Sequence, residues 1–378
     1  MGYEANFKAI KLGGRSDLLL LLTSTTGEQA WISNRGASIE ELVLKAPDGN
    51  LVRVVYGHHD VVAGGPRQTD PLVYNENAHT ASSQSRLENL MAGGVPITIL
   101  PGRLFEGEIH FLDPKGTYKV HKVPISHPQF NSLLHLGNGK NSDFEFEGIS
   151  EVKYNEPQTA DRSNITATLT QEKVGGLLYE DGFPRGISST VKYTLQNGVF
   201  IRDTTITNNS GIYLICPSSD HGSYMPGSGN ASDLTVLMKT RGELELASGT
   251  KVATGRLVST PSIFDDGKIV QIQGPMEGMY LLDDSVVEIM NKNQGVGLQL
   301  EADTKTRVVY VWVPGKSQFL SVQPYNGQPT AALSLPAFPP VKGMHDIFKQ
   351  TIERMIAPGD SITYRQIFRA INSHSPLH

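Results

Sequence analysis

The sequence predicts an all-β protein made of two large, mainly antiparallel sheets with little helix. Short runs rich in Val, Ile, Thr, Tyr and Phe recur throughout the 378 residues, and each is bounded by Gly, Asn, Asp or Pro. This is the pattern of strands joined by turns. Helical periodicity is rare. So many strands can bury their apolar faces only in packed sheets, which favours a large β-sandwich.

The predicted strands share this β-branched and aromatic composition. They are 30–33, 39–44, 52–56, 117–120, 165–171, 188–196, 199–208, 212–216, 234–238, 269–272, 286–290, 296–301, 308–313, 319–323 and 362–368. Asn197-Gly198 supplies the positive φ angles of a tight turn, so the strands on either side of it are expected to pair as a hairpin. The segment 344–355 instead has apolar residues at helical spacing, which predicts a short helix covering an edge of the sandwich.

Composition bounds the organisation of the chain. It is 38% hydrophobic and 19% charged, which is enough apolar material for a large core. No linker rich in Pro, Ser or Gly and no block of like charges divides it, so residues 1–378 are expected to form one domain.

Several function classes are disfavoured. The net charge is −5, with Lys and Arg scattered, so no nucleic-acid partner is expected. The longest apolar run, 18–22, is too short to cross a membrane, and the N-terminus lacks the features of a secretory signal. No membrane partner is therefore expected, and the protein is expected to be cytoplasmic. The single cysteine, Cys216, suits a buried thiol in a reducing compartment.

Five blocks, in chain order, carry a resemblance to a known family. They are Gly36-Ala37-Ser38-Ile39 with Val54-Val55-Tyr56-Gly57, Gly93-Gly94-Val95-Pro96-Ile97 with Pro101-Gly102-Arg103, Leu134-His135-Leu136-Gly137, Asp220-His221-Gly222-Ser223-Tyr224, and Val322-Gln323-Pro324-Tyr325. Together they resemble the aldose 1-epimerases, or galactose mutarotases, over nearly the whole chain. The resemblance implies a galactose mutarotase-like supersandwich with a carbohydrate-binding cleft on one sheet. It also implies an isomerase that acts on a sugar. The chain is expected to be a monomer or a homodimer.

Mutarotation opens a hexopyranose to the free aldehyde and recloses it on the other face. One group must protonate the ring oxygen while another removes the proton of the anomeric hydroxyl, and histidine suits the acid role near neutral pH. By resemblance His221 is the general acid. His135 is the second histidine, which binds and polarises the sugar, and Arg103 bonds a sugar hydroxyl.

Two further substrate-binding residues follow from the resemblance. Tyr224 completes the His221 block. Glu277 is nearest to the position of the substrate-orienting aspartate, although Asp283 and Asp284 are equally available in the sequence. No spacing of Cys, His and carboxylates resembles a metal site, and no cofactor is expected.

The chain departs from the family at the general base. The family has a glutamate where this sequence has Gln323, and an amide can hold a hydroxyl but has no usable proton affinity near neutral pH. Losing a positioned base typically costs about 10²- to 10⁴-fold in rate. Either the glutamine is an introduced replacement, or another carboxylate substitutes, or the protein is no ordinary mutarotase.

The His221 block also departs from the family pattern, with Asp220 in place of asparagine and Gly222 inserted. Asp220 would raise the pKa of His221 if the two side chains met, but strand neighbours point to opposite faces, so this needs a bend. Two alternatives to mutarotation therefore stay open. One is an atypical member that isomerises or cyclises another hydroxylated substrate, and the other is a non-catalytic carbohydrate-binding protein.

Overall fold

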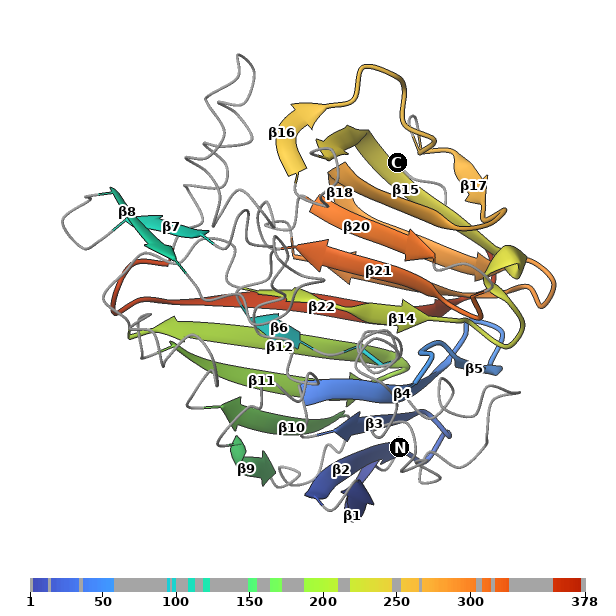
Figure 1. Cartoon of the computed structure of the whole chain (residues 1–378). Helices are drawn as coiled ribbons and strands as arrows, with labels where there is room; N and C mark the ends of the chain where they lie inside the picture. Colours follow the sequence, from blue (N-terminus) through green and yellow to red (C-terminus); the bar gives the residue numbers. More distant parts are fainter. Residues whose placement is uncertain are drawn as a thin grey trace.

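The computed structural model is built almost entirely from antiparallel strands (Figure 1). It describes residues 3–12, 15–33, 37–57, 94–95, 97–99, 108–112, 118–122, 149–154, 164–171, 187–209, 218–246, 253–264, 267–303, 308–313, 317–325 and 356–374. A short 3-10 helix, η4 (Ala231–Asp233), interrupts the strands. The all-β prediction is confirmed.

Three sheets are present in this part of the chain. The small sheet has five strands in chain order: β1 (Tyr3–Leu12), β2 (Arg15–Ser24), β3 (Gln29–Ser33), β4 (Ser38–Lys45) and β5 (Leu51–Arg53). A separate hairpin joins β7 (Glu108–Leu112) to β8 (Tyr118–Lys122).

The large sheet has fifteen strands. Its main path runs β6 (Ile97–Ile99), β13 (Ser218–Asp220), β21 (Leu320–Tyr325), β20 (Val308–Val313), β18 (Met276–Asn291), β19 (Val296–Ala302), β22 (Ser361–Ile371), β12 (Val199–Asn208), β11 (Ile187–Gln196), β10 (Asn164–Gln171) and β9 (Ile149–Tyr154). Off this path, β14 (Gly222–Tyr224) pairs with β21, and β15 (Leu234–Leu246) pairs with β16 (Ala253–Leu257), β17 (Ile269–Gln271) and β18.

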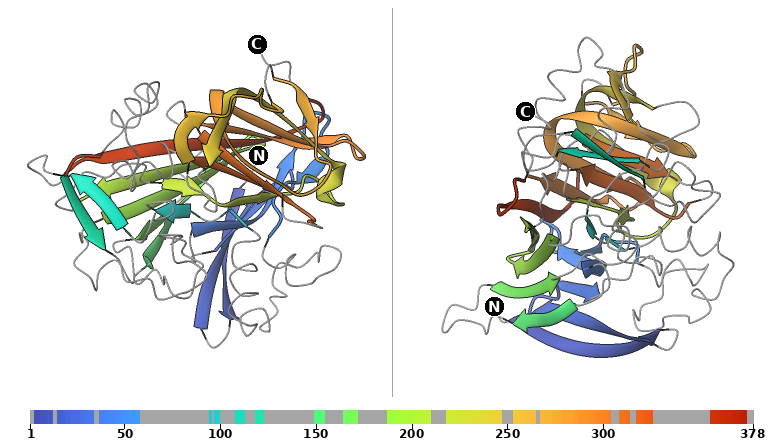
Figure 2. Two further views of the ribbon diagram at one scale, coloured as in Figure 1. Left: turned by 45° about the horizontal axis from the view of Figure 1, so that its top comes forward. Right: turned by 60° about the vertical axis from the view of Figure 1, so that its left-hand side comes forward.

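The small sheet packs beside one end of the large sheet (Figures 1 and 2). Strand β2 contacts β11, and β4 contacts both β12 and β22. Aromatic rings fill this junction: Tyr193 stacks on Phe200 at 5.9 Å between ring centroids, and Phe200 meets Phe368 edge-on, also at 5.9 Å. All three are buried in one hydrophobic cluster with residues of the small sheet such as Ile32 and Leu42. Burial of this shared apolar surface holds the sheets together.

The predicted strand 212–216, with Cys216, and the predicted helix 344–355 lie outside the described residues. That residues 1–378 form one domain stays a prediction. In the described part of the chain, no helix has the length and apolar character needed to cross a membrane.

The hairpin predicted at Asn197-Gly198 is confirmed. Gln196 and Val199 are register partners that close it, and the two turn residues have φ angles of 49° and 76°. Positive φ at both central residues is what a type I′ turn requires, and its twist matches that of the flanking strands. The turn therefore sets the register of β11 and β12, and β12 contributes Arg202 to the centre of the molecule.

We predict that Gly198→Ala lowers the free energy of unfolding by about 1–2 kcal/mol, because a side chain is disfavoured at positive φ. A Cβ atom there would have only an ordinary contact, 3.5 Å from the Lys45 carbonyl oxygen, so the loss measures backbone strain. Gly274→Ala is the control, since its added Cβ would have no atom within 4 Å. Equal denaturant midpoints for the two variants would contradict the prediction.

Candidate active site

Strand register brings His221 and Gln323 together. Ser219 pairs with Tyr325, and Gly222 pairs with Val322. The same register places His221, which lies between β13 and β14, opposite Gln323 on β21. Directly opposed residues of an antiparallel pair have Cβ atoms about 5 Å apart and point to the same face. The two residues expected from distant parts of the sequence are therefore neighbours.

Two rows of side chains cross this region of the sheet. Gln323 is opposite Tyr310 on β20, which extends the row that begins at His221. In the next row Ser223 is opposite Ser321, Ser321 is opposite Trp312, and Trp312 is opposite Glu277 on β18. Because the rows are two residues apart on each strand, all these side chains share one face. We call it the polar face: His221, Ser223, Glu277, Tyr310, Trp312, Ser321 and Gln323.

Contacts across the polar face agree with this arrangement. The His221 ring meets the Trp312 ring edge-on, at 6.2 Å between centroids and 68° between planes. The Gln323 Nε2 atom donates to Ser321 Oγ at 3.1 Å, and the Tyr310 hydroxyl donates to Glu277 Oε1. His221 and Gln323 are only 4% and 3% exposed, whereas Glu277 is exposed. The face thus runs from a covered end to an open end.

The opposite face of these strands is apolar, and glycines help to keep it so. Gly222 and Gly278 belong to one cross-strand row through Val311 and Val322. A Cβ atom at either glycine would overlap the ring of the tyrosine two residues later, Tyr224 or Tyr280. The inserted glycine of the His221 block therefore makes room for an aromatic ring in the core.

The predicted site residues fall into three groups. His221, Gln323 and Glu277 share the polar face. Tyr224 points to the core, where it is 0% exposed and burial raises the pKa of its hydroxyl, so the structure places it apart from the other three. Arg103 and His135 lie outside the described residues.

The two rival carboxylates on β18 have other partners. Asp283 forms an exposed ion pair with Arg241, with Oδ1 2.7 Å from Nε. Asp284 Oδ1 accepts a bond from the Val286 backbone N–H at 3.1 Å. Of the three carboxylates considered from the sequence, Glu277 is the one that the strand register aligns with Trp312. In the described part of the chain, no group of three or more His, Cys, Asp and Glu side chains is arranged to hold a metal ion.

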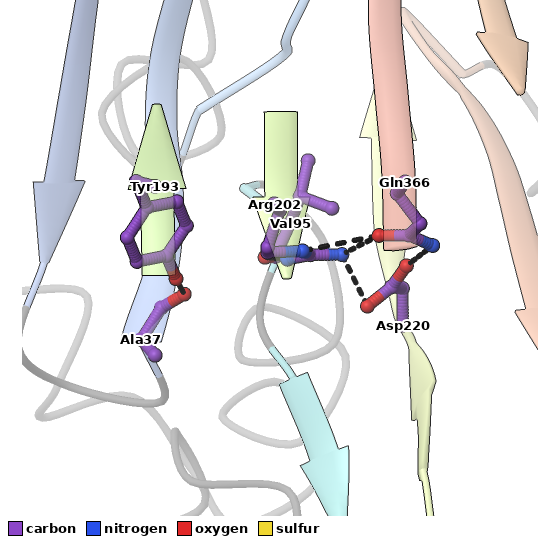
Figure 3. Close-up of polar contacts among 6 residues, drawn as sticks. All are labelled: Ala37, Val95, Tyr193, Arg202, Asp220 and Gln366. Carbon is purple, nitrogen blue, oxygen red and sulfur yellow. Dashed lines mark hydrogen bonds and ion pairs between the residues drawn. The ribbon is translucent and has the colours of Figure 1, made fainter. Parts of the chain in front are cut away.

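A buried polar network surrounds Asp220, the residue before His221 in the chain; Figure 3 shows Asp220 with its partners. Arg202 of β12 is 0% exposed, and its Nη2 atom is paired with Asp220 Oδ1. Gln366 of β22 donates to Asp220 Oδ2 and accepts from Arg202 Nε at 3.0 Å. Arg202 Nη1 donates to the Val95 carbonyl oxygen at 2.9 Å. Arginine, aspartate and glutamine thus form a closed ring of polar contacts.

This network fixes Asp220 on the core side of its strand. Burial raises the pKa of the Asp220 carboxyl, and the Arg202 guanidinium opposes that rise. Since strand neighbours point to opposite faces, Asp220 binds Arg202 while His221 faces Trp312. Asp220 can therefore act on His221 only through the backbone: its pairing with Arg202 fixes the position of the chain segment that carries the imidazole.

Comparison of the sequence with family models and with curated proteins found no match. The structure, however, is similar to solved structures over nearly its whole length. A galactose mutarotase-like protein from Clostridium acetobutylicum has a TM-score of 0.69 at 14% identity, covering 98% of this chain and 99% of its own. A galactose 1-epimerase from Lactobacillus acidophilus NCFM has a TM-score of 0.63 at 12% identity, covering 99% and 100%.

A third neighbour is an aldose epimerase homologue from C. elegans. Its TM-score is 0.62 at 13% identity, and the match covers 98% of this chain and 100% of the other. The architecture therefore belongs to the class of large antiparallel β-sandwiches. Within that class it is the galactose mutarotase-like fold, as the sequence blocks predicted.

We predict that Asp220→Ala lowers the free energy of unfolding by about 3–5 kcal/mol, because it leaves the buried Arg202 charge without its partner. The double variant Arg202→Met/Asp220→Ala is expected to lose much less than the sum of the single changes. Chemical denaturation measures both.

Asp203→Ala is the matched control. It removes another Arg–Asp pair formed by β12, in which Asp203 Oδ1 lies 2.7 Å from Arg365 Nε and the arginine side chain is 59% exposed. Exposed pairs contribute about 0–1 kcal/mol. Additive losses at Arg202 and Asp220, or a loss no larger than at Asp203, would contradict a coupled buried network.

Proposed function

We propose that this chain is an aldose 1-epimerase-like isomerase that acts on the anomeric centre of a sugar or a sugar-like hemiacetal. One observation carries the proposal: strand register sets His221 opposite Gln323 on a polar face of a galactose mutarotase-like fold. A histidine can exchange a proton near neutral pH, and an amide beside it can hold a hydroxyl. These two groups meet two of the requirements for opening a hemiacetal: a proton donor for the ring oxygen and a group that binds a hydroxyl.

The proposed roles follow from the chemistry of each group. His221 protonates the ring oxygen as the ring opens and takes that proton back as it closes. The Gln323 amide donates to and accepts from sugar hydroxyls, and the Trp312 indole beside His221 offers an apolar surface for a sugar ring. Arg103 and His135 remain predicted substrate-binding residues. No cofactor is needed for this reaction.

Mutarotation of freshly dissolved α-D-galactose and α-D-glucose tests the proposal. Polarimetry or proton NMR is expected to show faster anomer exchange with the protein than in buffer. His221→Ala is expected to slow the catalysed rate by about 10²- to 10⁴-fold, because a positioned general acid is lost.

Thr207→Ala is the control variant, since Thr207 bonds Ser361 at an exposed position of the β12–β22 pair. Its rate should equal that of the wild type. If neither the wild type nor Gln323→Glu accelerates exchange of either sugar, simple mutarotation is excluded. Calorimetric binding of a sugar without turnover would instead assign the face to carbohydrate binding.

A further inference from the structure

Building on the proposed function, we infer that Glu277, held by Tyr310, is the general base of the reaction. The carboxylate that position 323 lacks is thus supplied from another strand of the same face. The amide of Gln323 cannot take a proton from the anomeric hydroxyl near neutral pH. Catalysis by the polar face therefore needs a proton acceptor elsewhere on it.

Glu277 is the carboxylate that this part of the sheet provides. Two acidic side chains occur in β13, β14, β21, β20 and the segment of β18 that pairs with β20: Asp220 and Glu277. Asp220 is on the core side and is bound to Arg202 and Gln366. Glu277 shares the face of His221 and Gln323 and is exposed, so a substrate can reach it from solvent.

The contact with Tyr310 turns Glu277 toward the substrate-binding residues. Tyr310 is directly opposite Gln323, and its hydroxyl donates to Glu277 Oε1. The carboxylate is therefore drawn from its own strand toward β20, the strand next to Gln323. A carboxylate has about four acceptor positions, so it can bond Tyr310 and a sugar hydroxyl together.

The proton balance of the step closes with these two groups. Glu277 takes the proton of the anomeric hydroxyl, the bond between the anomeric carbon and the ring oxygen breaks, and the anomeric C=O forms. Protonated His221 gives its proton to the ring oxygen, which becomes a hydroxyl. After rotation about the adjacent C–C bond, the same transfers run in reverse and close the ring on the other face.

The test compares amide variants of two glutamates. Glu277→Gln is expected to lower kcat by about 10²- to 10⁴-fold, with a much smaller change in KM, because the base is lost while hydroxyl binding is retained. Glu301→Gln is the matched control. The Glu301 side chain, on β19, is 42% exposed, and its Oε2 atom lies 2.5 Å from Nη1 of Arg369 on β22. This variant should leave kcat unchanged.

Two further variants separate base catalysis from structural damage. Glu277→Gln/Gln323→Glu is expected to recover activity, since it restores one carboxylate to the polar face at the other position. Glu277→Asp is expected to retain more activity than Glu277→Gln, because it keeps a carboxylate. The acid limb of the pH–rate profile should persist in Glu277→Asp and be lost in Glu277→Gln.

The outcomes distinguish this inference from the function on which it rests. Wild-type turnover with an unimpaired Glu277→Gln would overturn the inference alone. A raised KM at unchanged kcat would also overturn it, because Glu277 would then only orient the sugar. A wild type that accelerates the exchange of no anomer would overturn the proposed function and the assignment of Glu277 together.

Discussion

The structure depends on how the charge and the hydrogen-bond donors of one buried arginine are paired. Arg202 is 0% exposed, and a guanidinium removed from water is tolerated only when it is paired and hydrogen-bonded. Its partners come from three places: Asp220 of β13, Gln366 of β22 and the Val95 carbonyl. Val95 is in turn bridged to Ile39 of the small sheet. One charge thereby couples both layers of the sandwich and restricts how their strands can slide.

The same network sets the orientation of the candidate site. Asp220 can bind Arg202 only from the core side, and alternation along the strand then turns His221 to the opposite face. A shift of one residue in register would exchange the two faces, turning the imidazole to the core side and the aspartate to the polar face. The ion pair therefore acts on the chemistry through strand register.

Parts of this arrangement could be read from the sequence, and others could not. The β-branched runs, the Asn197-Gly198 turn and the His221 and Gln323 blocks were visible because they are local. The hairpin of β1 and β2 was missed, since β2 contains a continuous leucine run without alternation and leucine is not β-branched.

Tyr310, Trp312 and Arg202 were also missed, and the reason is physical. Their importance comes from pairing between strands that are distant in the sequence, which no single run encodes. Tyr310 and Trp312 looked like ordinary strand aromatics, and an arginine within a strand is usually exposed. The alternation of residues 308–313 did place both aromatics on one face, but only the register with β18 and β21 shows that this face also carries Glu277 and Gln323.

Burial gives a reason for glutamine at position 323. The side chain there is only 3% exposed, and a carboxylate at such a position costs far more desolvation free energy than an amide, which needs only hydrogen bonds. Ser321 supplies one of these bonds at 3.1 Å. Glu277, two strands away, is exposed, so its carboxyl group stays hydrated, and it accepts a bond from the Tyr310 hydroxyl. The polar face thus places its neutral hydrogen-bonding group at the covered end and its anionic group at the open end, and each is where its solvation is least costly.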